Sequence, residues 1–168
     1  MIKTFNSLFV TMLGLGKIKF IPGTFGSLAT TIFLYYLFHI LKISPNIVLI
    51  GLIITFIYSF YAISNHVKNS ENKDPGEIII DEFLGQSIPI YLYEISHGLI
   101  KDNNEAIIYY SVFFILFRYF DIIKPFPVNF FDKNFKNSFG VIMDDICAGF
   151  YVVLTLVCFM IIKSYILQ

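Results

Sequence analysis

Two apolar stretches of this chain, residues 46–64 and 146–167, are long enough to cross a lipid bilayer as helices. A helix rises about 1.5 Å per residue, so roughly 20 residues span the hydrocarbon core. Shorter apolar segments begin near residues 28, 83 and 105. The chain is 57% hydrophobic and only 14% charged, whereas an ordinary soluble domain carries about 25% charged residues. This pattern predicts an all-α, multi-helix bundle embedded in a membrane.

The balance of residue types argues against several other classes of protein. Lysine and arginine number 12, as do aspartate and glutamate, so the formal net charge is zero and no basic excess points to nucleic acid. The two cysteines, Cys147 and Cys158, both fall in the last apolar segment and lack the spacing of a metal site or a disulfide framework. We expect residues 1–168 to form one domain, and the sequence leaves its oligomeric state open.

The positively charged residues favour one orientation in the membrane. If all five apolar segments cross, the N-terminal loop, residues 65–82 and residues 118–145 fall on the same side. Nine of the 12 lysines and arginines then lie on that side. The positive-inside rule assigns that side to the cytoplasm. The prediction is a multi-pass protein of the cytoplasmic membrane, in which loops at the cytoplasmic face carry the polar motifs and with them the functional site.

The N-terminal part of the chain is predicted to be a short amphipathic helix over residues 1–13, followed by a loop over residues 14–31. The loop is rich in glycine and hydroxyl residues, which favour turns. Thr24 or Ser27 could cap the helix that follows. A glycine-rich loop before a helix can bind phosphate through backbone N–H groups, although an ordinary loop with a capped helix fits the same residues.

Two acidic pairs stand at the ends of apolar segments. Asp81 and Glu82 open the third segment, and Asp144 and Asp145 come just before the last one. Charge in or beside a membrane is costly and indicates a functional site by default, although acidic residues in a first helical turn also interact well with the helix dipole. Residues 85–86, one turn after the first pair, are small or polar and leave the carboxylates room.

Cationic residues lie between the two acidic pairs. Arg118, Asp121 and Lys124 precede a Pro-Phe-Pro turn at residues 125–127, through which no helix can continue. Clustered carboxylates repel one another and therefore need a cation or shared protons. Oxygen ligands without a histidine or thiolate cluster suit Mg²⁺ or Mn²⁺ better than Zn²⁺. Carboxylate-bound Mg²⁺ beside arginine and lysine is suited to phosphoryl chemistry, and at a membrane face it indicates a lipid phosphate as substrate.

Four motifs resemble, in order and spacing, those of the phosphatidylglycerophosphatase A family. They read GKIKFIPGTFGSL, KDPGEIIIDEFLGQ, FRYFDIIKPFPV and FGVIMDDICAG, and cover roughly residues 18–27, 73–86, 117–128 and 139–149. Ser138 and Phe139 depart from the resemblance, which leads us to expect a more glycine-rich approach to the Met-x-Asp-Asp motif.

The resemblance implies an all-helical, Mg²⁺-dependent lipid phosphatase of the bacterial inner membrane. It would act on phosphatidylglycerophosphate within the bilayer, removing the terminal phosphate to give phosphatidylglycerol. The carboxylates implied in catalysis are Asp81, Glu82, Asp121, Asp144 and Asp145, of which Asp81, Glu82, Asp144 and Asp145 are implied as metal ligands. Those implied in substrate binding are Thr24, Ser27, Arg118 and Lys124.

Several alternatives remain open at the level of sequence. Attack by a Mg²⁺-activated water with a carboxylate as general base and attack by an aspartate to form a phosphoenzyme both fit the residues. A different lipid phosphate, such as phosphatidate, could be the substrate. A small cation transporter would place carboxylates in the middle of its spans, and only Glu94 is placed that way.

Overall fold

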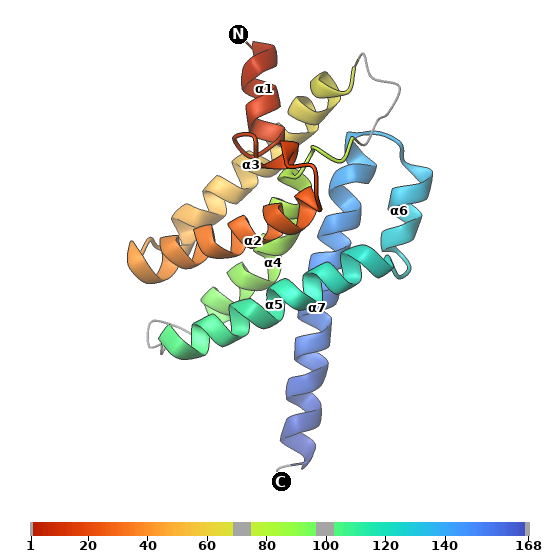
Figure 1. Cartoon of the computed structure of the whole chain (residues 1–168). Coiled ribbons are helices and arrows are strands. Elements are labelled where there is room, and N and C mark those ends of the chain that lie inside the picture. The colour runs from red at the N-terminus through yellow and green to blue at the C-terminus, as the bar shows by residue number, and fades with distance from the viewer. Residues whose placement is uncertain (1, 69–74, 97–102, 167–168) are drawn as a thin grey trace.

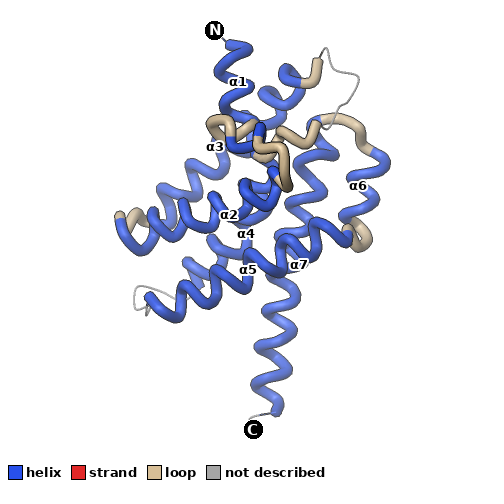
Figure 2. Tube along the Cα trace, in the orientation of Figure 1, coloured by secondary structure: helices blue, strands red, loops and turns tan. Residues whose placement is uncertain are grey.

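The computed structural model describes residues 2–68, 75–96 and 103–166, and over these residues it contains helices and no strands (Figures 1 and 2). The prediction of an all-α fold is therefore confirmed for this part of the chain. The elements in chain order are α1 (Ile2–Val10), a 3₁₀ turn η1 (Leu15–Lys17), α2 (Pro22–Tyr35), a π-helical turn η2 (Tyr36–Ile40), α3 (Pro45–His66), α4 (Ile80–Ser96), α5 (Asn103–Ile123), α6 (Val128–Asn134) and α7 (Ser138–Ile166).

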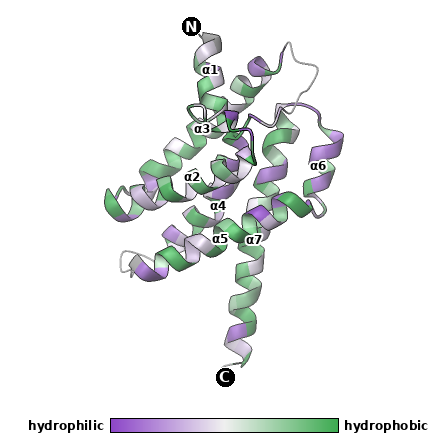
Figure 3. Cartoon of the chain, in the orientation of Figure 1, coloured by the Kyte–Doolittle hydropathy of each residue, from purple (hydrophilic) through white to green (hydrophobic). Residues whose placement is uncertain are grey.

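Three of the described helices are long and apolar enough to cross a membrane, namely α3, residues 104–123 of α5, and α7. The helix α2 has only 14 residues, and α4 has 17 and contains Pro89 and Glu94. Figure 3 shows mostly apolar residues along α3 and α7, with hydrophilic residues near the start of α4 and on α6. Three of the five predicted segments thus meet the length and hydropathy of a span.

Helix α4 lies inside the bundle and packs against α2, α3, α5 and α7. Its crossing with α7 is close because glycines meet there. A Cβ at Gly85 would collide with the backbone carbonyl of Asp145, and a Cβ at Gly149 would collide with the carbonyl of Gly85. Since the nearest atom that each Cβ would meet belongs to the backbone, a change of side-chain rotamer could not relieve either collision. Gly85 and Gly149 therefore allow the close approach of α4 and α7.

The glycine-rich region is more helical than predicted. Helix α2 begins at Pro22, a position that suits proline because the first N–H groups of a helix have no partner within it. Thr24 and Ser27 are therefore helical, and neither caps the helix: the N-cap residue is Ile21, with no side-chain cap. The Ser27 hydroxyl instead donates to the Gly23 carbonyl over 2.8 Å. The prediction of a loop over residues 14–31 is wrong from Pro22 onward, as is the prediction that Thr24 or Ser27 caps the next helix, because the glycines here provide close helix packing.

The last helix also begins earlier than predicted. Asn137 caps α7, since its Oδ1 accepts the backbone N–H groups of Phe139 and Gly140, each over 3.1 Å. Asp144 and Asp145 consequently lie in the second turn of α7. The prediction that loops carry the site is corrected at this point, because the acidic residues project from helices. The turn at residues 125–127 does end α5, as predicted, and α6 follows it.

A second polar cluster is buried at the far end of α4. Glu94, 8% exposed, accepts a hydrogen bond from the Tyr110 hydroxyl over 3.0 Å and lies 3.2 Å from His39 Nε2. The ring of Tyr35 stacks on the His39 ring. These residues come from α2, η2, α4 and α5, so the cluster ties together the helices of the main apolar core.

Candidate active site

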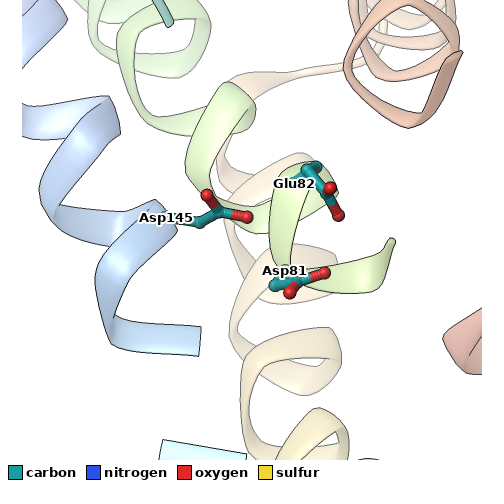
Figure 4. A group of neighbouring side chains, drawn as sticks. All are labelled: Asp81, Glu82 and Asp145. Atoms are coloured by element: carbon teal, nitrogen blue, oxygen red, sulfur yellow. The ribbon is translucent and has the colours of Figure 1, made fainter. Parts of the chain in front are cut away.

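Three carboxylates converge where the first turn of α4 faces α7. Asp81, Glu82 and Asp145 each offer an oxygen, and these oxygens lie within 4.8 Å of one another. Asp81 is 7% exposed and Asp145 is 3% exposed. Figure 4 shows Asp145 extending from α7 toward the turn that carries the other two. We call these three residues the carboxylate triad.

The local structure explains why residues far apart in sequence meet here. Asp81 and Glu82 lie in the first turn of α4, where the helix dipole favours negative charge. The crossing at Gly85 brings the backbone of Asp145 against α4. A larger residue at that crossing would push α7, and with it the third carboxylate, away from the other two.

The triad is electrostatically crowded. The pKa of Glu82 is raised to about 7, chiefly by burial and in smaller part by the nearby charge of Asp121, although a hydrogen bond with Asp81 works in the opposite direction. The Oε2 atom of Glu82 is buried and has no hydrogen-bond partner among the described residues. Like charges at this separation are stable only if they share protons or bind a cation. Three oxygen donors without nitrogen or sulfur ligands fit Mg²⁺.

One cation flanks the triad directly. Arg118 forms an ion pair with Asp121 over 2.7 Å, and its Nη1 lies 3.5 Å from the Ser27 hydroxyl. A Cβ added to Gly23 would collide with Glu82 Oε1 and lie 3.2 Å from Arg118 Nη1. Glu82 and Arg118 are thus neighbours across a point that only glycine leaves open.

The second cation belongs to a neighbouring network. Lys124 Nζ lies 3.0 Å from Asp144 Oδ2 and 2.8 Å from Asp132 Oδ1. Burial favours the neutral amine, but the hydrogen bonds and charges of Asp132 and Asp144 outweigh it and hold the pKa of Lys124 above its ordinary value. The same lysine holds the pKa of Asp132 below its ordinary value, against the opposing effect of burial.

The structure thus divides the predicted acidic and basic site residues into two sets. One set surrounds the carboxylate triad and contains Asp81, Glu82, Arg118, Asp121 and Asp145, and the other contains Lys124 and Asp144. Successive residues of a helix point about 100° apart, so Asp144 faces Lys124 while Asp145 faces α4. Thr24 is partly buried on α2 beside Gly23. Ser138, where the resemblance predicts more glycine, begins α7 and hydrogen-bonds Ser64 over 2.9 Å.

Sequence reasoning missed two contributors to the site. Asp132 lies eight residues beyond Lys124, on the other side of the proline turn, and only the folded turn makes them neighbours. Gly23 was interpreted as a loop residue, although a glycine four residues before a helical serine is also a signal for close helix packing.

A family model for phosphatidylglycerophosphatase A matches residues 8–160. A phosphatidylglycerophosphatase A of Haemophilus influenzae is 36% identical over 141 residues, which cover 84% of this chain and 80% of that protein. One from Escherichia coli is 31% identical, covering 81% and 72%. A Bacteroides thetaiotaomicron protein with the provisional name phosphatidylinositol-3-phosphatase is 32% identical, covering 84% of each chain. No solved structure gives a significant match. The chain therefore belongs to the phosphatidylglycerophosphatase A family.

Proposed function

We propose that this protein is a Mg²⁺-dependent phosphatase that hydrolyses the terminal phosphate monoester of phosphatidylglycerophosphate and leaves phosphatidylglycerol. The observation that carries the proposal is the carboxylate triad beside Arg118 in an apolar helical bundle. Family membership supports the choice of a phosphate monoester on a lipid, and the three span-length helices support a membrane setting.

Asp81, Glu82 and Asp145 are the residues that would hold Mg²⁺. When bound there, the metal would supply positive charge to the phosphate oxygens and make water a better nucleophile. Asp144, which the resemblance implies as a fourth ligand, is hydrogen-bonded to Lys124 instead. We therefore assign Asp144 the task of holding Lys124.

The remaining residues bind and orient the phosphate. The Arg118 guanidinium is held by Asp121, and a fixed guanidinium can donate two parallel hydrogen bonds to phosphate oxygens. Lys124 adds positive charge from the proline turn. Asp121 lies near Glu82 without being one of the triad, so it is our candidate to accept the proton of the attacking water.

We further propose that the site faces the cytoplasm from the bacterial inner membrane. The triad, Arg118 and Lys124 lie at one end of the bundle, where the start of α4 meets the end of α5. If all five apolar segments cross, nine of the 12 lysines and arginines belong to the connections on that side, and the positive-inside rule then supports this orientation.

A second candidate substrate deserves a direct comparison, because one relative is named for activity on a phosphoinositide. The test is phosphate release from phosphatidylglycerophosphate, phosphatidylinositol-3-phosphate and phosphatidate in matched detergent micelles with Mg²⁺. We expect kcat/KM to be highest for phosphatidylglycerophosphate. A higher value for either of the other two lipids would overturn the substrate assignment while leaving the lipid phosphatase intact.

The transporter alternative loses its main support. Glu94 was the one carboxylate placed as a transporter residue would be, and it is bound to Tyr110 and lies beside His39. A carboxylate engaged in this way serves to join helices.

A further inference from the structure

Gln86 is a buried polar residue close to the site that the roles assigned above do not use. Its side chain is 0% exposed, and neither its Oε1 nor its Nε2 has a hydrogen-bond partner among the described residues. A buried polar group that lacks a hydrogen-bond partner destabilises the folded state. Buried amides are therefore almost always bonded to protein or to ordered water.

The helices fix the place of Gln86 in the bundle. It lies four residues after Glu82 on α4, on the same side and one turn deeper. Gly23 of α2 meets Glu82, and His39 at the end of η2 meets Glu94. The α2–η2 segment therefore runs beside α4 in the same direction, and its middle part lies at the level of Gln86.

Helix α5 closes the opposite side of this space and runs the other way. Its Tyr110 reaches Glu94 near the far end of α4, whereas its Phe117 and Arg118 lie at the level of Gly85 and Glu82. The Gln86 side chain is therefore enclosed between α2, α4 and α5, just below the phosphate-binding arginine.

Unused hydrogen-bonding atoms gather in this space. Arg118 uses Nη1 for Asp121 and Ser27, but its buried Nε has no partner among the described residues. Ser27 and Thr30 of α2 are both 0% exposed, and each donates its hydroxyl proton to a carbonyl of its own helix. A hydroxyl oxygen can accept two hydrogen bonds, so the Ser27 oxygen, which already accepts from Arg118 Nη1, has one acceptor position left, and the Thr30 oxygen has two. The space thus offers one guanidinium donor, one amide and two hydroxyl oxygens.

We propose that an ordered water in this interior joins Gln86 to Arg118, and that Gln86 is a positioning residue for the phosphate-binding guanidinium. The water accepts from Arg118 Nε and donates to Gln86 Oε1, and the Gln86 amide N–H groups turn toward the hydroxyl oxygens. A buried water needs two to four polar partners, and a water-bridged bond is nearly as favourable as a direct one. The inference rests on the proposed function, in which Arg118 holds the phosphate.

The test replaces Gln86 by methionine, which keeps length and flexibility but lacks the amide. We expect the KM for phosphatidylglycerophosphate and the dissociation constant for inorganic phosphate each to rise about tenfold, with kcat changed less than threefold. Ser87→Ala is the matched control, because Ser87 is the next residue, is 1% exposed, and bonds the Phe83 carbonyl of its own helix over 2.6 Å. It should leave both constants unchanged.

A double-mutant cycle separates positioning from general packing. Lysine has no Nε–H donor, so Gln86→Met should add less than twofold to the defect of Arg118→Lys. If the two defects multiply, or if Gln86→Met binds phosphate like the wild type, the inference is wrong. Should the methionine variant fail to fold, Gln86→Asn takes its place under the same criteria, because asparagine withdraws the amide by one methylene.

Phosphate binding, measured by calorimetry with Mg²⁺ present, also distinguishes this inference from the proposed function. If the wild type binds phosphate but hydrolyses no lipid phosphate, the proposed function fails, and weaker binding by Gln86→Met still supports the role of Gln86. If the wild type binds no phosphate at all, both fail.

Discussion

The two ends of α4 bury polar side chains in opposite ways. At the far end Glu94 is matched by a hydroxyl donor and a neighbouring imidazole, so its burial costs little and links helices. At the near end Asp81, Glu82 and Asp145 crowd together, which costs stability unless a cation binds. About 18 Å separate Glu82 from Glu94 along the helix. Burial of charge alone does not mark a site; burial of mutually repelling charge does.

Asp145→Asn should give the largest effect on activity. We expect kcat/KM for phosphatidylglycerophosphate to fall at least about 100-fold, because the variant loses one negatively charged ligand of the Mg²⁺ that would stabilise the reacting phosphate. The metal-free variant should be at least as stable as the wild type, since one of three repelling charges is gone. Phosphate release and thermal unfolding in EDTA measure the two effects. Full activity would remove Asp145 from the site.

Gly23→Ala should give the next largest effect. The added methyl collides with Glu82 Oε1, a movable side-chain atom, and crowds Arg118. The protein should fold, while activity falls about tenfold because triad and guanidinium are displaced. Gly51→Ala is the matched control, since a Cβ there meets nothing within 4 Å. Equal activities for the two variants would show that the position of Glu82 does not matter.

The effect of pH on Mg²⁺ affinity should be smaller than the effects of these two substitutions on activity. Burial raises the pKa of Glu82 to about 7, so metal must displace a proton at lower pH. We expect affinity to rise severalfold between pH 6 and pH 8 and then level off. Without metal, the folded state holds that proton and the unfolded state does not, so stability should fall as pH rises from 4.5 toward 7. Titrations at four pH values, with Glu82→Gln as control, would show this. A flat profile would contradict the raised pKa.

Glu94→Gln should have the smallest effect on activity. The amide keeps the shape but weakens the bonds to Tyr110 and His39, so stability should drop by about 1–2 kcal/mol. Activity of the folded fraction should stay within about twofold, because the change lies roughly three helical turns from the triad. A loss as large as that of Asp145→Asn would mean that the far cluster belongs to the catalytic machinery.

The order of the apolar segments, the proline turn and the acidic pair heading α4 could all be predicted from the sequence, because each depends on local composition. The split between Asp144 and Asp145 could not, since it depends on where α7 begins, and that is set by the Asn137 cap. The helical state of Ser27 was missed for a related reason. Glycine favours both turns and close helix packing, and only the tertiary contact with Glu82 decides between them.

The pairing of Lys124 with Asp132 was also beyond local reasoning, because it forms across a turn whose geometry two prolines determine. The burial of Gln86 could be anticipated from its place one turn after Glu82. Its lack of a partner in the described chain could not, since that depends on three helices at once.

The most direct test of the carboxylate triad is phosphate release from phosphatidylglycerophosphate in micelles, measured for the wild type, Asp145→Asn and Glu94→Gln with Mg²⁺ and with EDTA. We predict Mg²⁺-dependent release by the wild type and Glu94→Gln, and none above background from Asp145→Asn. Release that persists in EDTA, or that survives in folded Asp145→Asn, would contradict the assignment of the near end of α4 as the metal-dependent catalytic centre.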